Sequence, residues 1–395
     1  MKKLAIIAAS LVLFASCKKS DNTTPAPTTP ITTPTVTPTG GTYSDLFNFT
    51  SSTGNGPYGD LIISGSTLYG MTQNGGANNV GCIFSIGTNG SGYKDLHDFS
   101  VSPADGELPY GDLTLSGTIL YGMAYQGGAN GGGVIFSINM DGSGYTIIHN
   151  FGTNSSDGYY PLGNLTIVGS TMYGATSEGG VNGLGNIFSI STTGTGYTNL
   201  HSFKTATGIS PESSLVVSGT MIYGTAYLGG GSNNDGVAYS FNMTGSVYTI
   251  LCTFTGANGA NPDGSLLLSG TTLYGMTNAG GANGDGNIFS VSTTGTGFTD
   301  LLDFNGANGN AAYGALIING TTLYGMTTSG GTQAGGNVFS INTNGSGFSN
   351  LVSFGLGGSP GAFPHGSLLL SNGVLYGMTN SGGANGEGVI FNYSL

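Results

Sequence analysis

The sequence predicts an all-β fold, a seven-bladed β-propeller with four antiparallel strands per blade. Three observations lead to it: a Tyr-Gly pair recurs with spacings of 50 to 52 residues, each period holds four short β-signals, and the two ends of the repeat region complement each other. A period near 50 is typical of propeller blades, whereas leucine-rich repeats have periods of about 20–29 residues. The pairs begin at Tyr69, Tyr121, Tyr173, Tyr223, Tyr274, Tyr324 and Tyr376.

The four β-signals of one period are clear in residues 264–304. A short apolar run at 264–269 is followed by "TLYGMTN" at 272–278, "GNIFSVS" at 286–292 and "FTDLLDF" at 298–304. Short segments rich in β-branched and aromatic residues, separated by glycine-rich turns, are typical of antiparallel strands. The body of the chain shows no apolar pattern with a helical period. Each period therefore predicts one four-stranded sheet.

The ends of the repeat region predict that the sheets close into a ring. The first β-signal, residues 43–49, matches the fourth strand of a period, and the last period stops after its third strand, residues 388–395. A linear array of such units would need capping repeats at its ends. If 43–49 pairs with 388–395, both unpaired edges disappear, and seven blades lie within the usual range of about 4–8.

The N-terminal 42 residues predict export and attachment to a membrane. "MKK" followed by the apolar "LAIIAASLVLF" has the form of a signal peptide over residues 1–16. The small residues before Cys17 resemble the lipobox of bacterial lipoproteins, which implies lipidation of Cys17; an ordinary secretory signal is the alternative. Lys18 follows where inner-membrane retention would have Asp, so the resemblance implies the bacterial outer membrane, on its surface or its periplasmic side. The rest of residues 17–42 is a Thr/Pro-rich tether, and 43–395 is the single propeller domain.

The charge of the chain excludes nucleic acid as a partner. The formal net charge is −12, the chain has no arginine, and only Lys94 and Lys204 lie beyond residue 40. A phosphate backbone or an anionic membrane surface is bound by clustered Lys and Arg. The predicted partners are the membrane, through the lipid anchor, and a glycan or an envelope protein. We expect the chain to be a monomer.

The repeated motif also resembles a known family. Leu-Tyr-Gly, then Gly-Gly, then Gly-x-(Ile/Val/Ala)-(Phe/Tyr) resembles the Gloeobacter–Verrucomicrobia ("GloVer") tandem repeat of bacterial surface proteins. The resemblance covers residues 43–395 and implies no activity, because that family is defined by its repeat. The fourth period departs most, with "AYLGGGSNNDGVAYS". Kelch, WD40 and quinoprotein repeats need tryptophan, and this chain has none.

Most repeated residues are predicted to be structural. We expect the Tyr of each Tyr-Gly pair and the Phe of "IF" to pack between blades, while the glycine lets a ring approach closely. His97, His149 and His201 share one position of the fourth strand, which the other periods fill with Cys252, Leu302, Val352 and Phe47. A position that accepts these residues is a packing position. We therefore predict no metal or catalytic role for the three histidines, since ligands must converge within bonding distance.

One variable position predicts a binding site at the mouth of the central channel. A motif of the form Pro-x-Gly-x-Leu stands before each innermost strand, where proline and glycine turn the chain inward. Its flanks repeat while the residue after the proline varies, as a differentiated site on a scaffold would. These mouth residues are Tyr58, Tyr110, Leu162, Glu212, Asp263, Tyr313 and His365. We predict that they ring the mouth and bind a ligand; exposed loop residues without a ligand are the alternative.

The same face carries much of the acidic charge. Eleven of the eighteen Asp and Glu residues fall in its loops or strand starts, among them Asp60, Asp105, Asp112 and Asp157. Negative potential attracts cations such as Ca²⁺, but no Asp-x-Asp-x-Asp loop is present. We therefore predict a solvated acidic face with no cofactor, and a calcium site in these loops is the alternative.

Three functions are compatible with these features. The first is a non-catalytic envelope lipoprotein whose propeller face binds a glycan or a surface protein. The second is a glycan lyase or hydrolase with Glu212, Asp263 and His365 as the acid/base set, since paired carboxyls about 5–9.5 Å apart can do this work. The lack of arginine and of a nucleophile motif disfavours an enzyme. The third is a structural spacer or assembly component without a small ligand.

Overall fold

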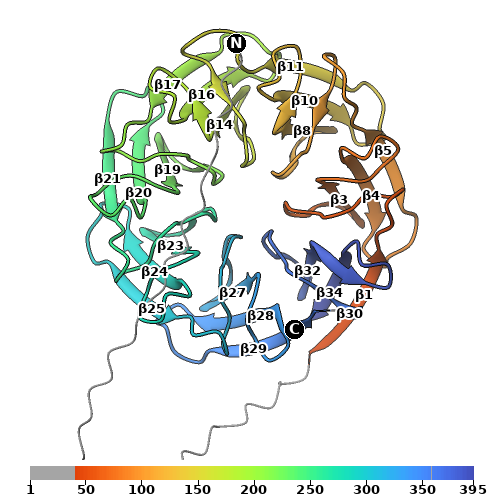
Figure 1. Cartoon of the computed structure of the whole chain (residues 1–395), viewed down its shortest axis with the longest axis vertical. Coiled ribbons are helices and arrows are strands. Elements are labelled where there is room, and N and C mark those ends of the chain that lie inside the picture. Colours follow the sequence, from red (N-terminus) through yellow and green to blue (C-terminus); the bar gives the residue numbers. More distant parts are fainter. Residues whose placement is uncertain (1–40, 357) are drawn as a thin grey trace, which may run out of the picture. The chain divides into compact units, whose positions relative to one another are not determined.

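The propeller is seen in a computed structural model that describes residues 41–356 and 358–395. The predicted signal peptide, Cys17 and all of the tether before Gly41 lie outside the described residues. Seven four-stranded antiparallel sheets are arranged around a central channel (Figure 1). The fold is therefore the predicted seven-bladed β-propeller. In the part of the chain that the structure describes, no helix is long and apolar enough to cross a membrane.

The first six blades each take their four strands from one stretch of the chain, in order from the channel outward. Blade 1 has β2 (Ile62–Ser64), β3 (Thr67–Thr72), β4 (Cys82–Gly87) and β5 (Lys94–Asp98). Blade 2 has β7 (Thr114–Ser116), β8 (Ile119–Ala124), β10 (Val134–Asn139) and β11 (Thr146–Asn150). Blade 3 has β13 (Thr166–Val168), β14 (Thr171–Thr176), β16 (Asn186–Ser191) and β17 (Thr198–Ser202). Blade 4 has β18 (Val216–Ser218), β19 (Met221–Ala226), β20 (Val237–Asn242) and β21 (Tyr248–Thr253). Blade 5 has β22 (Leu267–Ser269), β23 (Thr272–Met276), β24 (Asn287–Ser292) and β25 (Thr299–Asp303). Blade 6 has β26 (Ile317–Asn319), β27 (Thr322–Thr327), β28 (Ala334–Asn342) and β29 (Ser349–Gly355).

The seventh blade combines both ends of the chain. It contains β31 (Leu369–Ser371), β32 (Val374–Thr379) and β34 (Val389–Ser394), and its outermost strand is β1 (Thr42–Asn48). β1 pairs antiparallel with β34 from Thr42 opposite Ser394 to Asn48 opposite Val389. This pairing confirms the predicted closure and leaves no blade with an unmatched strand.

Three short two-stranded ladders form between loops on one face of the propeller. They pair β6 (Gly106–Glu107) with β9 (Gln126–Gly127), β12 (Gly158–Tyr159) with β15 (Glu178–Gly179), and β30 (Gly358–Ala362) with β33 (Ser381–Gly383). Each ladder ties the segment that enters a blade to the loop between that blade's second and third strands. The ladders therefore stiffen the face on which the predicted mouth lies.

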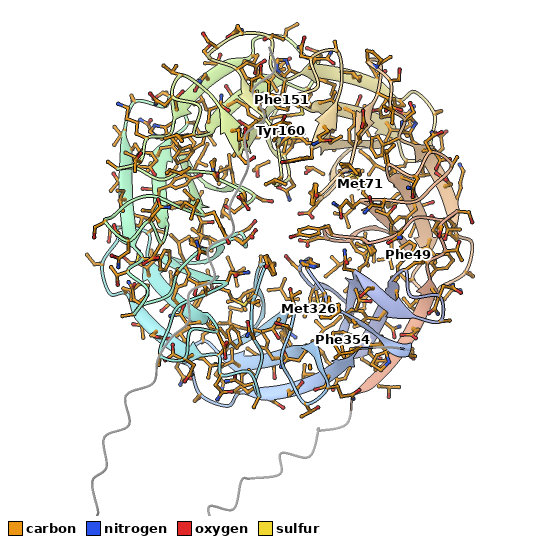
Figure 2. The ribbon with its side chains drawn as sticks, viewed as in Figure 1. Phe49, Met71, Phe151, Tyr160, Met326 and Phe354 are labelled. Carbon is orange, nitrogen blue, oxygen red and sulfur yellow. The ribbon has the colours of Figure 1, made fainter. Side chains whose placement is uncertain are left out.

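The core consists of seven apolar clusters, each between neighbouring blades. In one of them Tyr69 and Met71 of β3 pack with Leu120 and Phe136 of blade 2. Every blade has a buried phenylalanine at the end of its fourth strand or directly after it, and Figure 2 labels three of them, Phe49, Phe151 and Phe354. The predicted packing of the repeated Tyr and Phe rings between blades is confirmed.

The glycine of the Tyr-Gly pair makes room for a ring. A Cβ on Gly122 would lie 2.4 Å from Cζ of Phe136, which belongs to the next strand of the same blade. Real Cβ atoms do not approach other atoms so closely, so the mid-strand glycine is required by packing.

The innermost strands are shorter than the sequence predicts. The apolar run at 264–269 was expected to be a strand throughout, but β22 begins at Leu267. Gly264 instead approaches the next blade so closely that a Cβ there would lie 2.1 Å from the carbonyl oxygen of Gly314. The start of the run is thus a crossing into the channel, held by blade-to-blade contact.

Candidate functional site

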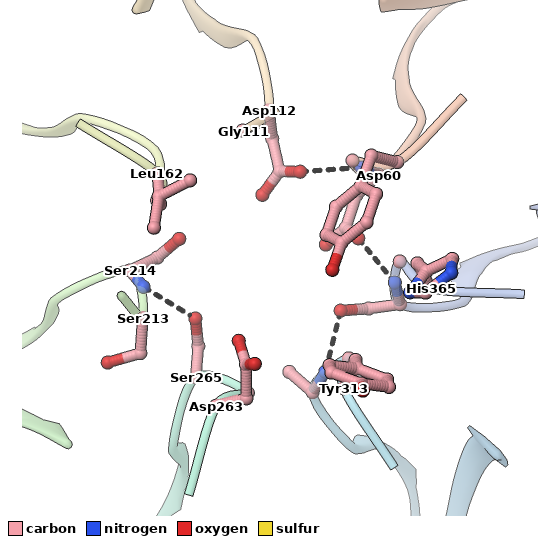
Figure 3. Close-up of a pocket in the computed structure, with 18 of the residues that line it drawn as sticks. Asp60, Gly111, Asp112, Leu162, Ser213, Ser214, Asp263, Ser265, Tyr313 and His365 are labelled. Carbon is pink, nitrogen blue, oxygen red and sulfur yellow. Dashed lines mark hydrogen bonds between the residues drawn. The ribbon is translucent and has the colours of Figure 1, made fainter. Parts of the chain in front are cut away.

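All seven predicted mouth residues line one opening of the central channel. Tyr58, Tyr110, Leu162, Glu212, Asp263, Tyr313 and His365 are all among its lining residues. Figure 3 shows the segments that carry them arriving from different blades, with Asp263 and Leu162 directed toward the axis. The sequence therefore located the residues that converge, while their role in binding stays a prediction.

The segment that delivers each mouth residue is held in an unusual backbone conformation. The residue before the motif has a positive φ in every blade, and Tyr160, with φ of 61°, is one of six that are not glycine. Its N–H donates to Gly132 O of the preceding blade at 2.9 Å, and its C=O accepts from Ser177 N at 3.1 Å. Such a conformation costs about 1–3 kcal/mol and persists only where the surroundings fix it. The mouth is therefore built on a rigid seam between blades.

A ring of glycines lines the opening. A Cβ on Gly111 would lie 2.2 Å from Gly163 O, and one on Gly59 would lie 2.3 Å from Gly111 O. Six of the seven motifs have glycine at this position, and the fourth has Ser213. Neighbouring backbones can touch here only because no side chain separates them.

The last variable residue of the motif links the blades by hydrogen bonds. The backbone N–H of one blade donates to a side-chain oxygen of the next blade. Asn164 N donates to Ser214 Oγ at 2.9 Å, and Ser214 N donates to Ser265 Oγ at 2.8 Å. Ala315 N donates to Ser367 Oγ at 2.8 Å, and Asp60 N donates to Asp112 Oδ1 at 2.5 Å. Ser367 N donates to Asp60 Oδ1, which continues the ring across the closure (Figure 3). Between blades 2 and 3 the direction is reversed, because Asn164 Nδ2 donates to Asp112 Oδ2 at 3.2 Å. We use the name acceptor ring for the seven positions Asp60, Asp112, Asn164, Ser214, Ser265, Ala315 and Ser367.

The acceptor ring was not predicted from the sequence, although a signal for it is present. Six of its seven positions are Asp, Asn or Ser, directly before an apolar strand. Two of them, Asp60 and Asp112, were assigned to the acidic loop charge. Burial raises the pKa of both carboxyls, and at Asp112 the Asp60 charge raises it further. They serve as acceptors between blades.

One side of the mouth is an aromatic arc. His365 stacks on Tyr58 with ring centroids 4.3 Å apart and lies 5.0 Å from Tyr313. Tyr58 meets Tyr110 edge to face at 5.1 Å, Tyr110 meets Tyr125 at 5.1 Å, and Tyr125 stacks on Tyr160 at 4.9 Å. The aromatic arc thus consists of Tyr313, His365, Tyr58, Tyr110, Tyr125 and Tyr160. Tyr125 and Tyr160 were not predicted from the sequence, because they lie outside the motif, at positions where most periods have small or polar residues.

The other side of the mouth is acidic. Burial raises the pKa of Glu212 to about 8, and the Asp263 charge adds to this effect. Burial raises the pKa of Asp263 to about 7. Between these two pKa values the pair of carboxyls holds one proton. Within residues 41–356 and 358–395, neither carboxyl makes a hydrogen bond or an ion pair with another side chain.

The two sides meet in a small pocket. Tyr58, Tyr110, Tyr125, Leu162, Glu212 and Asp263 enclose about 240 Å³, which we call the mouth pocket. Burial also lowers the pKa of His365 to about 4, so its imidazole is neutral at neutral pH. Its Nδ1 is buried without a hydrogen-bond partner among the described residues.

Part of the acidic charge expected on this face is buried and paired. Asp105 and Asp157 accept hydrogen bonds from His97 Nε2 at 3.1 Å and His149 Nε2 at 3.3 Å. A signal for these pairs is present in the sequence, because each Asp lies eight residues after its His, whereas Ile209 follows His201 at that distance. These two carboxylates are therefore not available to a ligand.

The three histidines occupy the predicted packing position. His97, His149 and His201 lie opposite Ile83, Ile135 and Ile187 in the ladders. Each imidazole stacks on a tyrosine of the following blade, with centroids 3.8 to 4.4 Å apart. Among the residues with described positions, no group of three or more His, Cys, Asp or Glu is placed to hold a metal ion.

Comparison with known families confirms the resemblance of the repeat. The model of the Gloeobacter/Verrucomicrobia repeat matches residues 32–234 and 228–395. The chain belongs to this family. The Gloeobacter/Verrucomicrobia repeat thus spans the whole propeller, including the divergent fourth period. No curated protein matches the chain at a significant level.

Several solved structures are similar to this propeller. An oligogalacturonate lyase from Vibrio parahaemolyticus is 9% identical with a TM-score of 0.55, covering 89% of this chain and 93% of its own. An oligogalacturonate lyase in complex with manganese is 10% identical with a TM-score of 0.57, and the alignment covers 87% of this chain and 89% of the lyase chain. The GH74 enzyme of Niastella koreensis is 16% identical with a TM-score of 0.55, and the alignment covers 82% of this chain and 50% of the enzyme chain. At such identities the likeness concerns the fold alone.

Proposed function

We propose that the protein is a non-catalytic lipoprotein of the bacterial cell envelope whose channel mouth binds a glycan. The observation that carries the proposal is the convergence of the seven mouth residues on one opening, with an aromatic arc on one side and two carboxyls on the other. Concave sites with aromatic walls and a few placed polar groups are typical of ligand recognition.

The aromatic arc supports a glycan more than a flat protein epitope. Tyrosine offers a flat apolar ring together with a polar hydroxyl, which suits the alternating C–H and O–H surfaces of a sugar. The mouth pocket, at about 240 Å³, is smaller than the sites of roughly 300–1,000 Å³ that hold drug-sized ligands. One sugar unit in the pocket, with its neighbours along the arc, fits these dimensions.

The location follows from the N-terminal sequence. Lipidation of Cys17 would anchor the chain in the outer membrane, and the Thr/Pro tether would hold the propeller away from the bilayer. A Cys17→Ser variant should leave the membrane fraction and lose labelling by a fatty-acid precursor. If it stayed in the membrane fraction unchanged, the anchor assignment would be wrong.

The binding function is tested with a panel of polysaccharides. Replacing Tyr58, Tyr110 and Tyr313 together by Ala should weaken binding of the recognised glycan at least about tenfold, because stacked rings contribute about 0.5–1.5 kcal/mol each. The matched control is the triple Phe variant, which keeps the rings and should keep most of the affinity. Unchanged melting temperatures show that both variants fold. A wild-type protein that bound no glycan but bound an envelope protein would replace the glycan version of the proposal.

The second candidate is a glycan lyase or hydrolase at the same mouth. The specific observation in its favour is the raised pKa of Glu212 and Asp263, since perturbed carboxyls in a cleft are often catalytic. The similarity to oligogalacturonate lyases reaches the fold only and adds no residue to this candidate. Release of reducing or unsaturated ends that Glu212→Gln abolishes would favour it. A structural spacer, the third candidate, predicts neither binding nor turnover.

A further inference from the structure

We propose that the mouth pocket recognises a positively charged amino group, as carried by an unacetylated amino sugar of a polysaccharide. This inference rests on the proposed glycan-binding function and names the chemical class of its ligand. Three features of the mouth carry it: carboxyls without a counter-charge, aromatic walls in the same pocket, and no cationic side chain among the described residues that line it.

The carboxyls of Glu212 and Asp263 have no counter-charge. Both line the mouth pocket, and no described side chain bonds to either of them. The two lysines of the propeller lie elsewhere: Lys94 donates to Asp141 O, and Lys204 follows β17 on the outer side of blade 3. Desolvated carboxylates without a partner are costly, and a cation that enters the pocket relieves that cost.

The facing wall of the same pocket consists of tyrosine rings. Tyr58 and Tyr110 meet edge to face, and so do Tyr110 and Tyr125, each pair at 5.1 Å. The negative face of an aromatic ring attracts an ammonium group that lies within about 6 Å of its centroid. The pocket thus offers an ammonium group both charge and ring faces, which a neutral amide could use only in part.

The arc beyond the pocket suits the rest of a sugar chain. Tyr313 and His365 continue it on one side, and Tyr160 continues it on the other. Figure 2 places Tyr160 beside the central opening. His365 is neutral near pH 7, so it adds no positive charge that would draw an anionic sugar. A uronate would meet two carboxyls and no cation.

Cation binding at the mouth pocket should depend on pH, because it depends on the ionisation of Glu212 and Asp263. Because burial raises the pKa of Asp263 to about 7 and that of Glu212 to about 8, both carboxyls are protonated well below pH 7 and both are ionised above about pH 8. A cation binds the deprotonated pair, so a permanently charged ammonium should bind more tightly as pH increases. The other titratable groups that line the mouth or interact with the pair are Tyr58, Tyr110, Tyr125, Tyr227, Tyr313, His365, Asp60 and Asp112.

The experiment compares matched ligands on the full-length chain by calorimetry at pH 7. A glucosamine trimer should bind at least about tenfold more tightly than the N-acetylglucosamine trimer, because a charge-assisted contact is stronger than a neutral one. Glu212→Gln and Asp263→Asn should each remove most of this preference. Glu387→Gln, an acidic residue of the same face outside the pocket, should leave it unchanged. Tetramethylammonium should raise the melting temperature more at pH 8.5 than at pH 6.

The outcomes separate this inference from the function beneath it. Equal or tighter binding of the acetylated trimer, abolished by the triple Ala variant of Tyr58, Tyr110 and Tyr313, overturns the inference and leaves glycan binding in place. Failure of both trimers and of every polysaccharide in the panel overturns both. Binding of a lysine-rich peptide that depends on Glu212, with no binding of the glucosamine trimer, would also overturn it, because the occupant would then be a protein.

Discussion

Single carboxyls of this protein have different roles according to their surroundings. Burial alone would raise the pKa of Asp157, but hydrogen bonds from His149 and from the backbone and hydroxyl of Thr153 outweigh it and lower the pKa to about 2. Glu212 and Asp263 lack such donors, so burial raises their pKa values. The same residue types therefore hold the scaffold at one place and stay available to a ligand at another.

The Asp157 carboxylate predicts a stability change at acid pH. A carboxyl whose pKa falls from 3.8 to about 2 on folding contributes about 2 kcal/mol, present above pH 4 and lost as the pH falls through 2. Wild type should thus lose about this much more stability between pH 4 and pH 2 than Asp157→Asn, measured by denaturant unfolding. Asp235→Asn, whose carboxylate contacts no histidine, is the control and should follow wild type. An identical pH profile for wild type and Asp157→Asn would contradict the assignment.

At the residue scale, the sequence predicted where site residues lie better than it predicted which side chains they contact. The seven mouth residues were located because their flanks repeat while they vary. Tyr125 and Tyr160 were not, because their proximity depends on how two neighbouring blades are juxtaposed. That Asp263 has no hydrogen-bond partner among the described side chains was also not predictable from the sequence, since it depends on where the donor groups lie in the folded protein.

Each blade is tied to the next by contacts that no single period contains. The positive-φ residue before each motif bonds to the preceding blade and to its own, as Tyr160 does with Gly132 and Ser177. The acceptor ring adds side-chain bonds from blade to blade. The predicted bounds of the innermost strands were wrong because contact between blades decides where pairing within the sheet begins. The apolar run alone does not show this boundary.

The acceptor ring predicts a stabilising substitution. Ala315 is its one member without a side-chain oxygen, so nothing at that position accepts from Ser265 N. Ala315→Ser should supply this acceptor and stabilise the propeller by about 0.5–1.5 kcal/mol, the usual net contribution of a hydrogen bond. Ser265→Ala removes the acceptor of Ser214 N and should destabilise it by about 1 kcal/mol or more. Urea denaturation measures both; a destabilising Ala315→Ser with a neutral Ser265→Ala would refute the role of the ring.

The mouth exists only because the whole molecule is a ring. Its residues come from all seven blades and are about fifty positions apart in sequence, so an open array would spread them along a line. The period, the four β-signals and the complementary ends were enough to predict this architecture. The shape and charge of the mouth were not predictable in full, because they depend on side-chain packing across blade seams.

Ring closure is tested most directly by a disulfide across the seventh blade. Ser44 lies opposite Asn392 in the β1–β34 ladder. The Ser44→Cys, Asn392→Cys variant should therefore form an intramolecular disulfide under mild oxidation, read by peptide mapping and by altered mobility without reductant. The matched control pairs Ser44→Cys with Ser290→Cys, at the equivalent position of β24 in blade 5, and should stay unlinked. A Ser44–Asn392 pair that did not crosslink, or that did so no better than the control, would contradict the closed ring and the shared mouth with it.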